Sequence, residues 1–250
     1  MSSFLERTLA TYQRNEIITP YLEEALMKND AWPEEYGVKV YNKERLFDNM
    51  YHPSSDVSAG EYRLYYKFHP ELRLECQEER ISPTLQMTFQ VGSAFHSVIQ
   101  SMLIHLGFTS LDKVEVKIHN EERMIAGAID ILELTLPDGS SFLVDIKSCN
   151  KLPNEATYQY SMQLRVYQDN HPDAPERMAL LFIEKSYPHR MRAIEVPQDE
   201  KELNKLYDKW SKVRVAIRNN DPSGLEQCCE GPADANFLAC PARRICAVWN

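Results

Sequence analysis

The sequence predicts an α/β protein in which a central mixed β-sheet is flanked by helices. Three observations lead to this prediction. Segments with the two-residue alternation of strands are interspersed with segments whose apolar residues recur every three or four positions, as in helices. Two long apolar strands are joined by Asp138-Gly139, one of the strongest short hairpin signals. A chain of 250 residues with 43% hydrophobic content can bury one substantial core.

The individual elements follow from these patterns in chain order. Short helices broken at Pro20 are expected before residue 50. The pattern then predicts a helix within residues 51–75, a helix over 85–106, a strand over 114–118, the hairpin over 125–148, a helix over 155–170, strands over 177–185 and 190–197, and an amphipathic helix over 203–217. We therefore expect an N-terminal helical extension over 1–54, a core over 55–222 and a cysteine-rich tail over 223–250 that packs on the core.

Two aspartates and a lysine occupy the expected hairpin, whose strands are otherwise apolar. With a two-residue loop at Asp138-Gly139, Asp145 lies opposite Leu132. In the same register Lys147 lies opposite Asp130, so that all three charged side chains share one face. Two carboxylates that are diagonal neighbours, roughly 7–8 Å apart, can share a cation. Two alternatives stay open: the charges could pair on a solvated face, and a three-residue loop would place Asp130 on the other face.

The composition argues against some classes of function. A formal net charge of −9 does not suit a protein that coats nucleic acid through a global basic surface. No apolar run approaches the ~20 residues of a membrane helix, and charges interrupt the N-terminus where a signal peptide is apolar. We therefore expect no membrane partner and a cytoplasmic protein that is not secreted. In such a compartment the six cysteines are not expected to form a disulfide framework.

Four short motifs resemble the RecB-like, AddB-like exonuclease branch of the PD-(D/E)XK nucleases, which share a restriction-endonuclease-like core. In chain order they are "GSAFH" (Gly92 to His96), "GAID" (Gly127 to Asp130), "DIK" (Asp145 to Lys147) and "QLRVY" (Gln163 to Tyr167). Gly127 would also let another backbone or a substrate approach beside Asp130. Glu115 resembles an acidic residue that some relatives carry on the preceding strand.

The resemblance implies the roles of the site residues. The implied ligands of Mg²⁺ or Mn²⁺ are His96, Asp130, Asp145 and the carbonyl of Ile146, and the implied catalytic residues are Asp130, Asp145, Lys147, Gln163 and Tyr167. Lys147 would orient or help deprotonate the attacking water. Carboxylates suit this chemistry, because hard cations prefer oxygen ligands and phosphodiester hydrolysis needs such cations.

Cysteines crowd the end of the chain. The segment "CPARRIC", from Cys240 to Cys246, resembles the C-x5-C end of the iron–sulphur staple in several RecB-like nucleases. The resemblance implies a 4Fe-4S cluster held by Cys76, Cys229, Cys240 and Cys246. Two identities stay open, because Cys228 could replace Cys229 and His69 could replace Cys76. Zinc on the same residues, or free thiols, are the alternatives.

The sequence therefore predicts a metal-dependent DNA nuclease. The favoured activity is that of an exonuclease on single-stranded or end-bearing DNA in recombination, repair or replication, with DNA and a recombination or replication protein as partners. A structure-specific endonuclease and a catalytically silent DNA-binding module are the alternatives. Basic residues that could contact a phosphate backbone are Lys185, His189, Arg190 and Arg192 in one segment and Lys205, Lys209, Lys212 and Arg218 in another.

Overall fold

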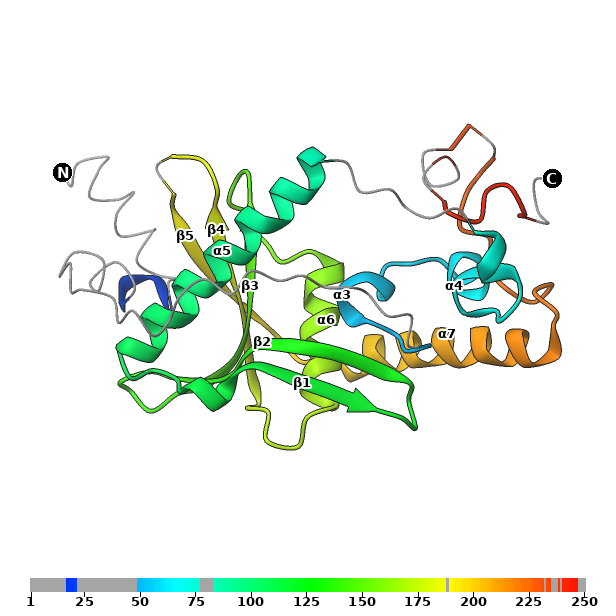
Figure 1. The fold of residues 1–250 in the computed structure, drawn as a ribbon. Helices are drawn as coiled ribbons and strands as arrows, with labels where there is room; N and C mark the ends of the chain where they lie inside the picture. The colour runs from blue at the N-terminus through cyan, green and yellow to red at the C-terminus, as the bar shows by residue number, and fades with distance from the viewer. Residues whose placement is uncertain are drawn as a thin grey trace, which may run out of the picture.

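A five-stranded mixed sheet forms the centre of the fold and confirms the predicted α/β class (Figure 1). The structure is a computed structural model that describes residues 17–21, 49–76, 83–187, 189–231, 233–234, 238 and 240–246. Most of the expected extension, residues 1–54, lies outside the described residues. The strands are β1 (Val114–Asn120), β2 (Ile125–Thr135), β3 (Ser141–Cys149), β4 (Arg177–Glu184) and β5 (Met191–Val196).

The strands lie side by side in chain order, and only the β3–β4 pair is parallel. A parallel pair needs a crossover connection, which helix α6 (Tyr158–Asp169) provides between these two strands. The other helices are α3 (Pro53–Asp56), α4 (Glu61–Phe68), α5 (Pro83–His105) and α7 (Glu200–Asn219), with short 3-10 helices at Leu72–Glu75 and Leu111–Lys113. None of these described helices has the length and apolarity that crossing a membrane requires.

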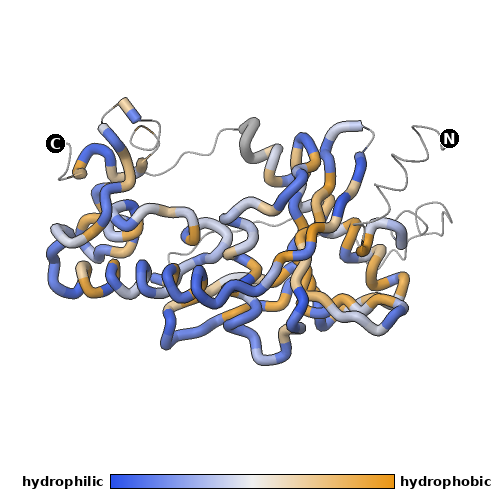
Figure 2. The backbone as a smooth tube through the Cα atoms, turned by 180° about the vertical axis from the view of Figure 1, so that it is seen from behind, coloured by the Kyte–Doolittle hydropathy of each residue, from blue (hydrophilic) through white to orange (hydrophobic). Residues whose placement is uncertain are grey.

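Helices cover both faces of the sheet. Alternate residues of β3 divide between the two faces, since Val144 and Ile146 pack with α5 while Leu143 packs with α6. Figure 2 shows that apolar residues are concentrated in the strands. Ile18, in the described part of the N-terminal region, is fully buried in the α5-side core. The region before residue 55 therefore contributes to the core of the protein.

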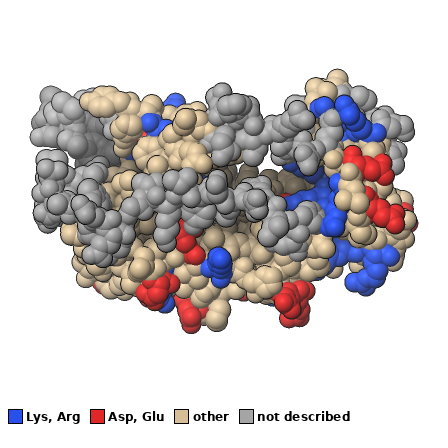
Figure 3. Space-filling model, viewed as in Figure 1, with Lys and Arg blue, Asp and Glu red and all other residues tan. Residues whose placement is uncertain are grey.

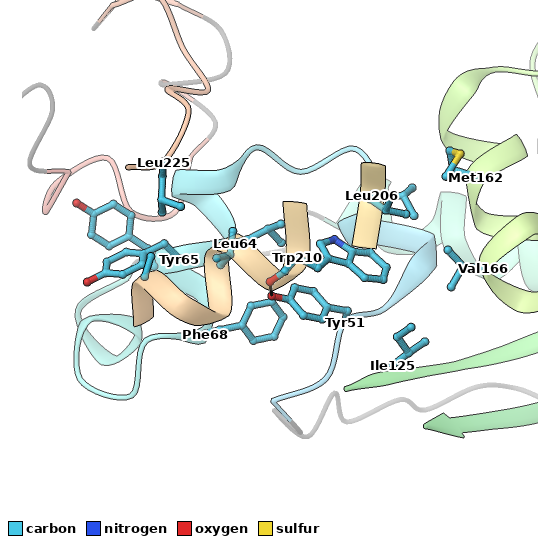
Figure 4. Packing of buried hydrophobic residues seen from close by; sticks show 14 of the residues in the cluster. Tyr51, Leu64, Tyr65, Phe68, Ile125, Met162, Val166, Leu206, Trp210 and Leu225 are labelled. Carbon is cyan, nitrogen blue, oxygen red and sulfur yellow. Dashed lines mark hydrogen bonds between the residues drawn. The ribbon is translucent and has the colours of Figure 1, made fainter. Parts of the chain in front are cut away.

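A third apolar cluster joins α7 to the sheet (Figure 4). Trp210 of α7 stacks on Tyr51 with ring centroids 4.6 Å apart and an interplanar angle of 4°. The Tyr51 hydroxyl donates to the Trp210 carbonyl oxygen at 3.0 Å. The Tyr51 backbone in turn bonds to the start of β2, where its carbonyl accepts from the amide of Ala126. Tyr51 thus links the α3–α4–α7 layer to the strand that carries Asp130.

The turn between β2 and β3 contains three residues, 137–139, where a two-residue loop is predicted. The amide of Leu136 donates to the carbonyl of Ser140 at 2.9 Å, which closes the loop. Gly139, the last residue of the loop, has a φ of 82°, a left-handed conformation that glycine adopts without a steric penalty. The predicted loop length is therefore wrong by one residue.

A β-bulge in β2 shifts the register again, a few residues from the turn. Leu134 pairs with Phe142, and Ile131 pairs with Val144. The two pairs are three residues apart along β2 but only two residues apart along β3. The extra residue belongs to β2, as is usual for a bulge. The predicted pairing of Asp145 with Leu132 is therefore wrong. Continuing the Ile131–Val144 register by one residue brings Asp130 opposite Asp145.

Candidate metal and catalytic site

Three potential ligands from three different elements meet beside the bulge. His96 of α5, Glu115 of β1 and Asp130 of β2 each present one ligand atom, and these atoms lie within 4.8 Å of one another. His96 Nδ1 is 3.4 Å from Asp130 Oδ2. Helix α5 passes close to β3 at Gly92, where a Cβ would lie 3.2 Å from Ser148 Oγ and the serine side chain would have to shift slightly. The first residue of the "GSAFH" motif thus lies where the helix approaches the sheet.

The Asp130 carboxylate lies in the sheet itself, where β2 and β3 diverge. Its Oδ2 accepts the backbone N–H of Ile146 at 2.7 Å, so the side chain takes the place of a ladder acceptor. Burial raises the pKa of Asp130, but His96, Lys147 and the Ile146 N–H outweigh that effect and hold the pKa below its usual range. Asp130 is therefore an ionised carboxylate despite its burial. The structure brings Ile146 to the site through its N–H, and a role for its carbonyl stays a prediction.

A hydrogen-bonded chain of side chains links β3 to α6 on the other side of Asp130. Lys147 Nζ lies 2.7 Å from Asp145 Oδ2 and donates to Gln163 Oε1 at 2.9 Å. Gln163 Nε2 donates to Asp145 Oδ1 at 2.9 Å and to the Tyr167 hydroxyl at 3.2 Å. The spacing of four residues places Gln163 and Tyr167 on one helix face. The "QLRVY" motif therefore orients the charged pair of the "DIK" motif.

Burial and mutual charge shift the pKa values of these groups. Burial raises the pKa of Asp145 to about 6, with a further contribution from Asp130 and opposition from Lys147. Burial lowers the pKa of Lys147, but Asp145 and Asp130 outweigh it and leave the pKa raised. Burial also lowers the pKa of His96, but the neighbouring Asp130 carboxylate outweighs burial and leaves the pKa raised. Clusters of such shifted groups are typical of functional sites.

The side chain of Tyr167 approaches the backbone closely at Gly127, where the sequence suggests another backbone or a substrate. A Cβ at this position would lie 3.0 Å from Cε1 and 3.2 Å from the hydroxyl of Tyr167. The neighbour is therefore the tyrosine ring of the QxxxY motif rather than backbone or substrate. This contact fixes Tyr167 against β2 and holds α6 over the site.

Each of the four motifs contributes at least one residue to the site, and the structure adds Gln100. This residue follows His96 by one turn of α5, and its Nε2 donates to Glu115 Oε1 at 2.9 Å and to the Asp130 carbonyl at 3.0 Å. The sequence signal for Gln100 is the four-residue spacing from His96, which puts both on one helix face. Nothing in the sequence indicates that Glu115 has a φ of 52°, a left-handed conformation that is uncommon outside glycine.

Three of the four predicted basic residues of α7 have partners within the protein. Lys209 donates to the carbonyls of Val57 and Ala59, Lys212 pairs with Glu61, and Lys205 pairs with Glu202. In the other basic segment Arg190 pairs with Glu184, and Arg192 donates to the Pro153 carbonyl and Asn154. On the face shown in Figure 3, Lys and Arg side chains gather mostly at the end that carries α4, among Asp and Glu side chains. Basic character is local, as the net charge implies.

Five cysteines approach one another where the tail meets α4. Cys76 and Cys240 pack against the third apolar cluster, and Cys246 is buried in it. Burial raises the pKa of the Cys76 thiol, and Cys240 adds to the rise. Burial likewise raises the pKa of Cys228, to which Cys229 and Cys240 contribute. Cys229 and Cys228 are thus both neighbours of Cys240.

Two further contacts bear on this cysteine group. A Cβ at Gly60 would lie 2.1 Å from the Cβ of Cys228, so only glycine lets the tail pack here. His69 Nε2 is 2.9 Å from Asn220 Oδ1, and its Nδ1 accepts the amides of Glu71 and Leu72 at 3.3 Å. Both ring nitrogens of His69 are therefore engaged, which favours Cys76 as the upstream thiol.

Comparison with known proteins shows no family for this chain. No protein-family model matches the chain, and no curated protein matches it. The crystal structure of SSO0001 is similar, with 17% sequence identity and a TM-score of 0.45 over 92% of this chain and 96% of SSO0001.

Proposed function

We propose that this protein is a metal-dependent DNA nuclease of the RecB-like PD-(D/E)XK type, acting as an exonuclease on single-stranded or end-bearing DNA. One observation carries the proposal. Four motifs spread between residues 92 and 167 supply side chains to a single site at the divergence of β2 and β3. Separate motifs with only structural roles have no reason to concentrate a histidine, two carboxylates and a lysine in one place.

The donor set fits a hard divalent cation. His96, Glu115 and Asp130 offer one nitrogen and two carboxylate oxygens within 4.8 Å of one another, and oxygen-rich sets of this kind bind Mg²⁺ or Mn²⁺. Asp145 lies in the same charged group, since its carboxylate acts on the pKa of His96. When bound, such a cation stabilises the negative charge that develops on a phosphodiester during hydrolysis.

The remaining side chains would position the reactants. A raised pKa keeps Lys147 protonated near neutral pH, so its ammonium group is a hydrogen-bond donor for an attacking water or a phosphate oxygen. Asp145 and Gln163 hold that ammonium group from two sides. Tyr167 and Gly127 hold Gln163 in place through the packing of α6 on β2. The chain of contacts thus fixes Lys147 before substrate arrives.

Cleavage of end-labelled linear and closed circular DNA tests the proposal. We expect degradation of linear DNA with Mg²⁺ or Mn²⁺ and none with EDTA, because the carboxylates need a cation to act on phosphate. Cutting of closed circles would identify the endonuclease alternative. DNA binding without cleavage under any divalent cation would contradict the enzyme and favour the silent binding module.

The cysteine group is proposed to hold a 4Fe-4S cluster through Cys76, Cys240, Cys246 and one of the adjacent pair Cys228 and Cys229. The thiols lie in one region of the fold. In the part of the chain that the structure describes, however, no three sulfur atoms lie within 4.8 Å of one another. A tetrahedral zinc site, with Zn–S bonds of about 2.3 Å, requires closer sulfurs than this. A cluster with four iron atoms holds its four thiolates further apart than a single zinc ion does.

Metal analysis of protein purified without oxygen tests the cluster. We expect bound iron and sulfide and a brown colour in the wild type, and their loss in Cys240→Ser, because each thiolate ligates one iron. Cys149→Ser is the matched control, since Cys149 lies at the end of β3 and its Sγ contacts the Ile183 carbonyl. Zinc in place of iron would show the zinc alternative, and neither metal would show free thiols.

A further inference from the structure

One buried amide ties two parts of the candidate cation site together. Gln100 is 7% exposed, and its Nε2 donates to Glu115 Oε1 and to the carbonyl oxygen of Asp130. Both partners are acceptors, so only the amide nitrogen can face them. Gln100 thus presents a donor to the carboxylate of one potential ligand and to the backbone of another.

The residue that Gln100 contacts has an unusual backbone. Glu115 has a φ of 52°, while Val114 and Val116 on either side of it pair with β2 in an unbroken register. A left-handed conformation is unfavourable for a residue with a side chain, and such strain persists where the surroundings enforce it. The Gln100–Glu115 hydrogen bond is a specific contact that selects one position of this carboxylate.

We propose that Gln100 is a positioning residue that holds the Glu115 carboxylate in reach of His96 and Asp130 and so sets the affinity for the divalent cation. This inference rests on the proposed cation site. Gln100 acts through Glu115, because its nitrogen, which cannot bind a cation, faces the site. Partners that orient a metal ligand change metal affinity by about 10- to 100-fold when they are removed.

The experiment measures Mn²⁺ binding by calorimetry to the full chain, without DNA. Gln100→Met keeps the length of the side chain and removes the donor, and we expect Mn²⁺ to bind about 10-fold more weakly. In a Glu115→Gln background the same change is expected to have no further effect, because the carboxylate that Gln100 positions is gone. Gln198→Met, at an exposed glutamine whose amide donates to the Glu176 carbonyl, is the control.

Thermal unfolding in EDTA separates positioning from a structural role. A purely structural Gln100 would lower the melting temperature and leave the Mn²⁺ affinity of the folded protein unchanged. Unchanged affinity in folded Gln100→Met, or an equal loss in both backgrounds, overturns the inference. If that variant does not fold, Gln100→Asn, which retains a shorter amide, allows the same comparison. A wild type that binds no Mn²⁺ overturns the proposed cation site itself.

Discussion

Replacing Asp145 by asparagine is expected to lower metal-dependent DNA cleavage by about 1,000-fold or more. The change keeps the size of the side chain and the acceptor for Gln163, but it removes the charge that contributes to cation binding and holds Lys147. Loss of one group that stabilises charge in the transition state has effects of this order. The measurement is the initial rate on end-labelled linear DNA at saturating Mn²⁺.

The fold of the Asp145→Asn protein should survive. Because burial raises the pKa of Asp145 to about 6 against the opposing effect of Lys147, the ionised carboxylate disfavours the folded state at pH 7 even with its ion pair, and the variant loses that unfavourable charge. Melting temperatures in EDTA should therefore be similar for the variant and the wild type. Asp173→Asn, at an exposed position after α6, controls for the chemistry of the change. Full cleavage by a folded Asp145→Asn protein would contradict the proposed site.

Trp210→Ala is expected to lower the free energy of unfolding by about 3–5 kcal/mol. The indole is 1% exposed and stacks on Tyr51, so its removal loses both buried apolar area and a ring contact (Figure 4). At ~2–4 °C per kcal/mol for a chain of this size, the melting temperature should fall by roughly 6–20 °C.

The control for Trp210→Ala lies on the same helix. Val215 is 47% exposed, and Val215→Ala should change the melting temperature little. Because Tyr51 also bonds to the start of β2, we expect the variant to lose protection from hydrogen exchange around Ala126 before the α5 side of the sheet does. A stability equal to the wild type would show that the α7 layer contributes nothing to the folded state.

The sequence predicts best where one periodic pattern decides the structure. Helix α5 is long and amphipathic, and its predicted range of 85–106 agrees closely with Pro83–His105. The five strands are recognisable from alternation and from the proline, glycine and asparagine residues between them. Local composition is sufficient for these elements, because each one buries a face that its own sequence marks.

Register and unusual backbone are not predictable in this way. The loop of residues 137–139 and the bulge near Leu132 depend on packing between strands and helices, which no local pattern records. The sequence points to Glu115 only through a resemblance and does not point to Gln100, because the contact between them joins a helix to a strand. Long-range hydrogen bonds of this kind become visible only in the folded chain.

The hairpin contains two one-residue shifts, the extra residue of its loop and the extra residue of the bulge in β2, and their effects on the face that Asp130 occupies cancel. An extra loop residue alone would send Asp130 to the side of the sheet away from Asp145, since strand side chains alternate. The extra residue of the bulge restores the original parity, so the two aspartates remain neighbours although every partner between them has changed. A one-residue insertion in either strand between Asp130 and Asp145 should therefore turn one aspartate to the opposite face of the sheet, whereas a two-residue insertion should leave both on the same face.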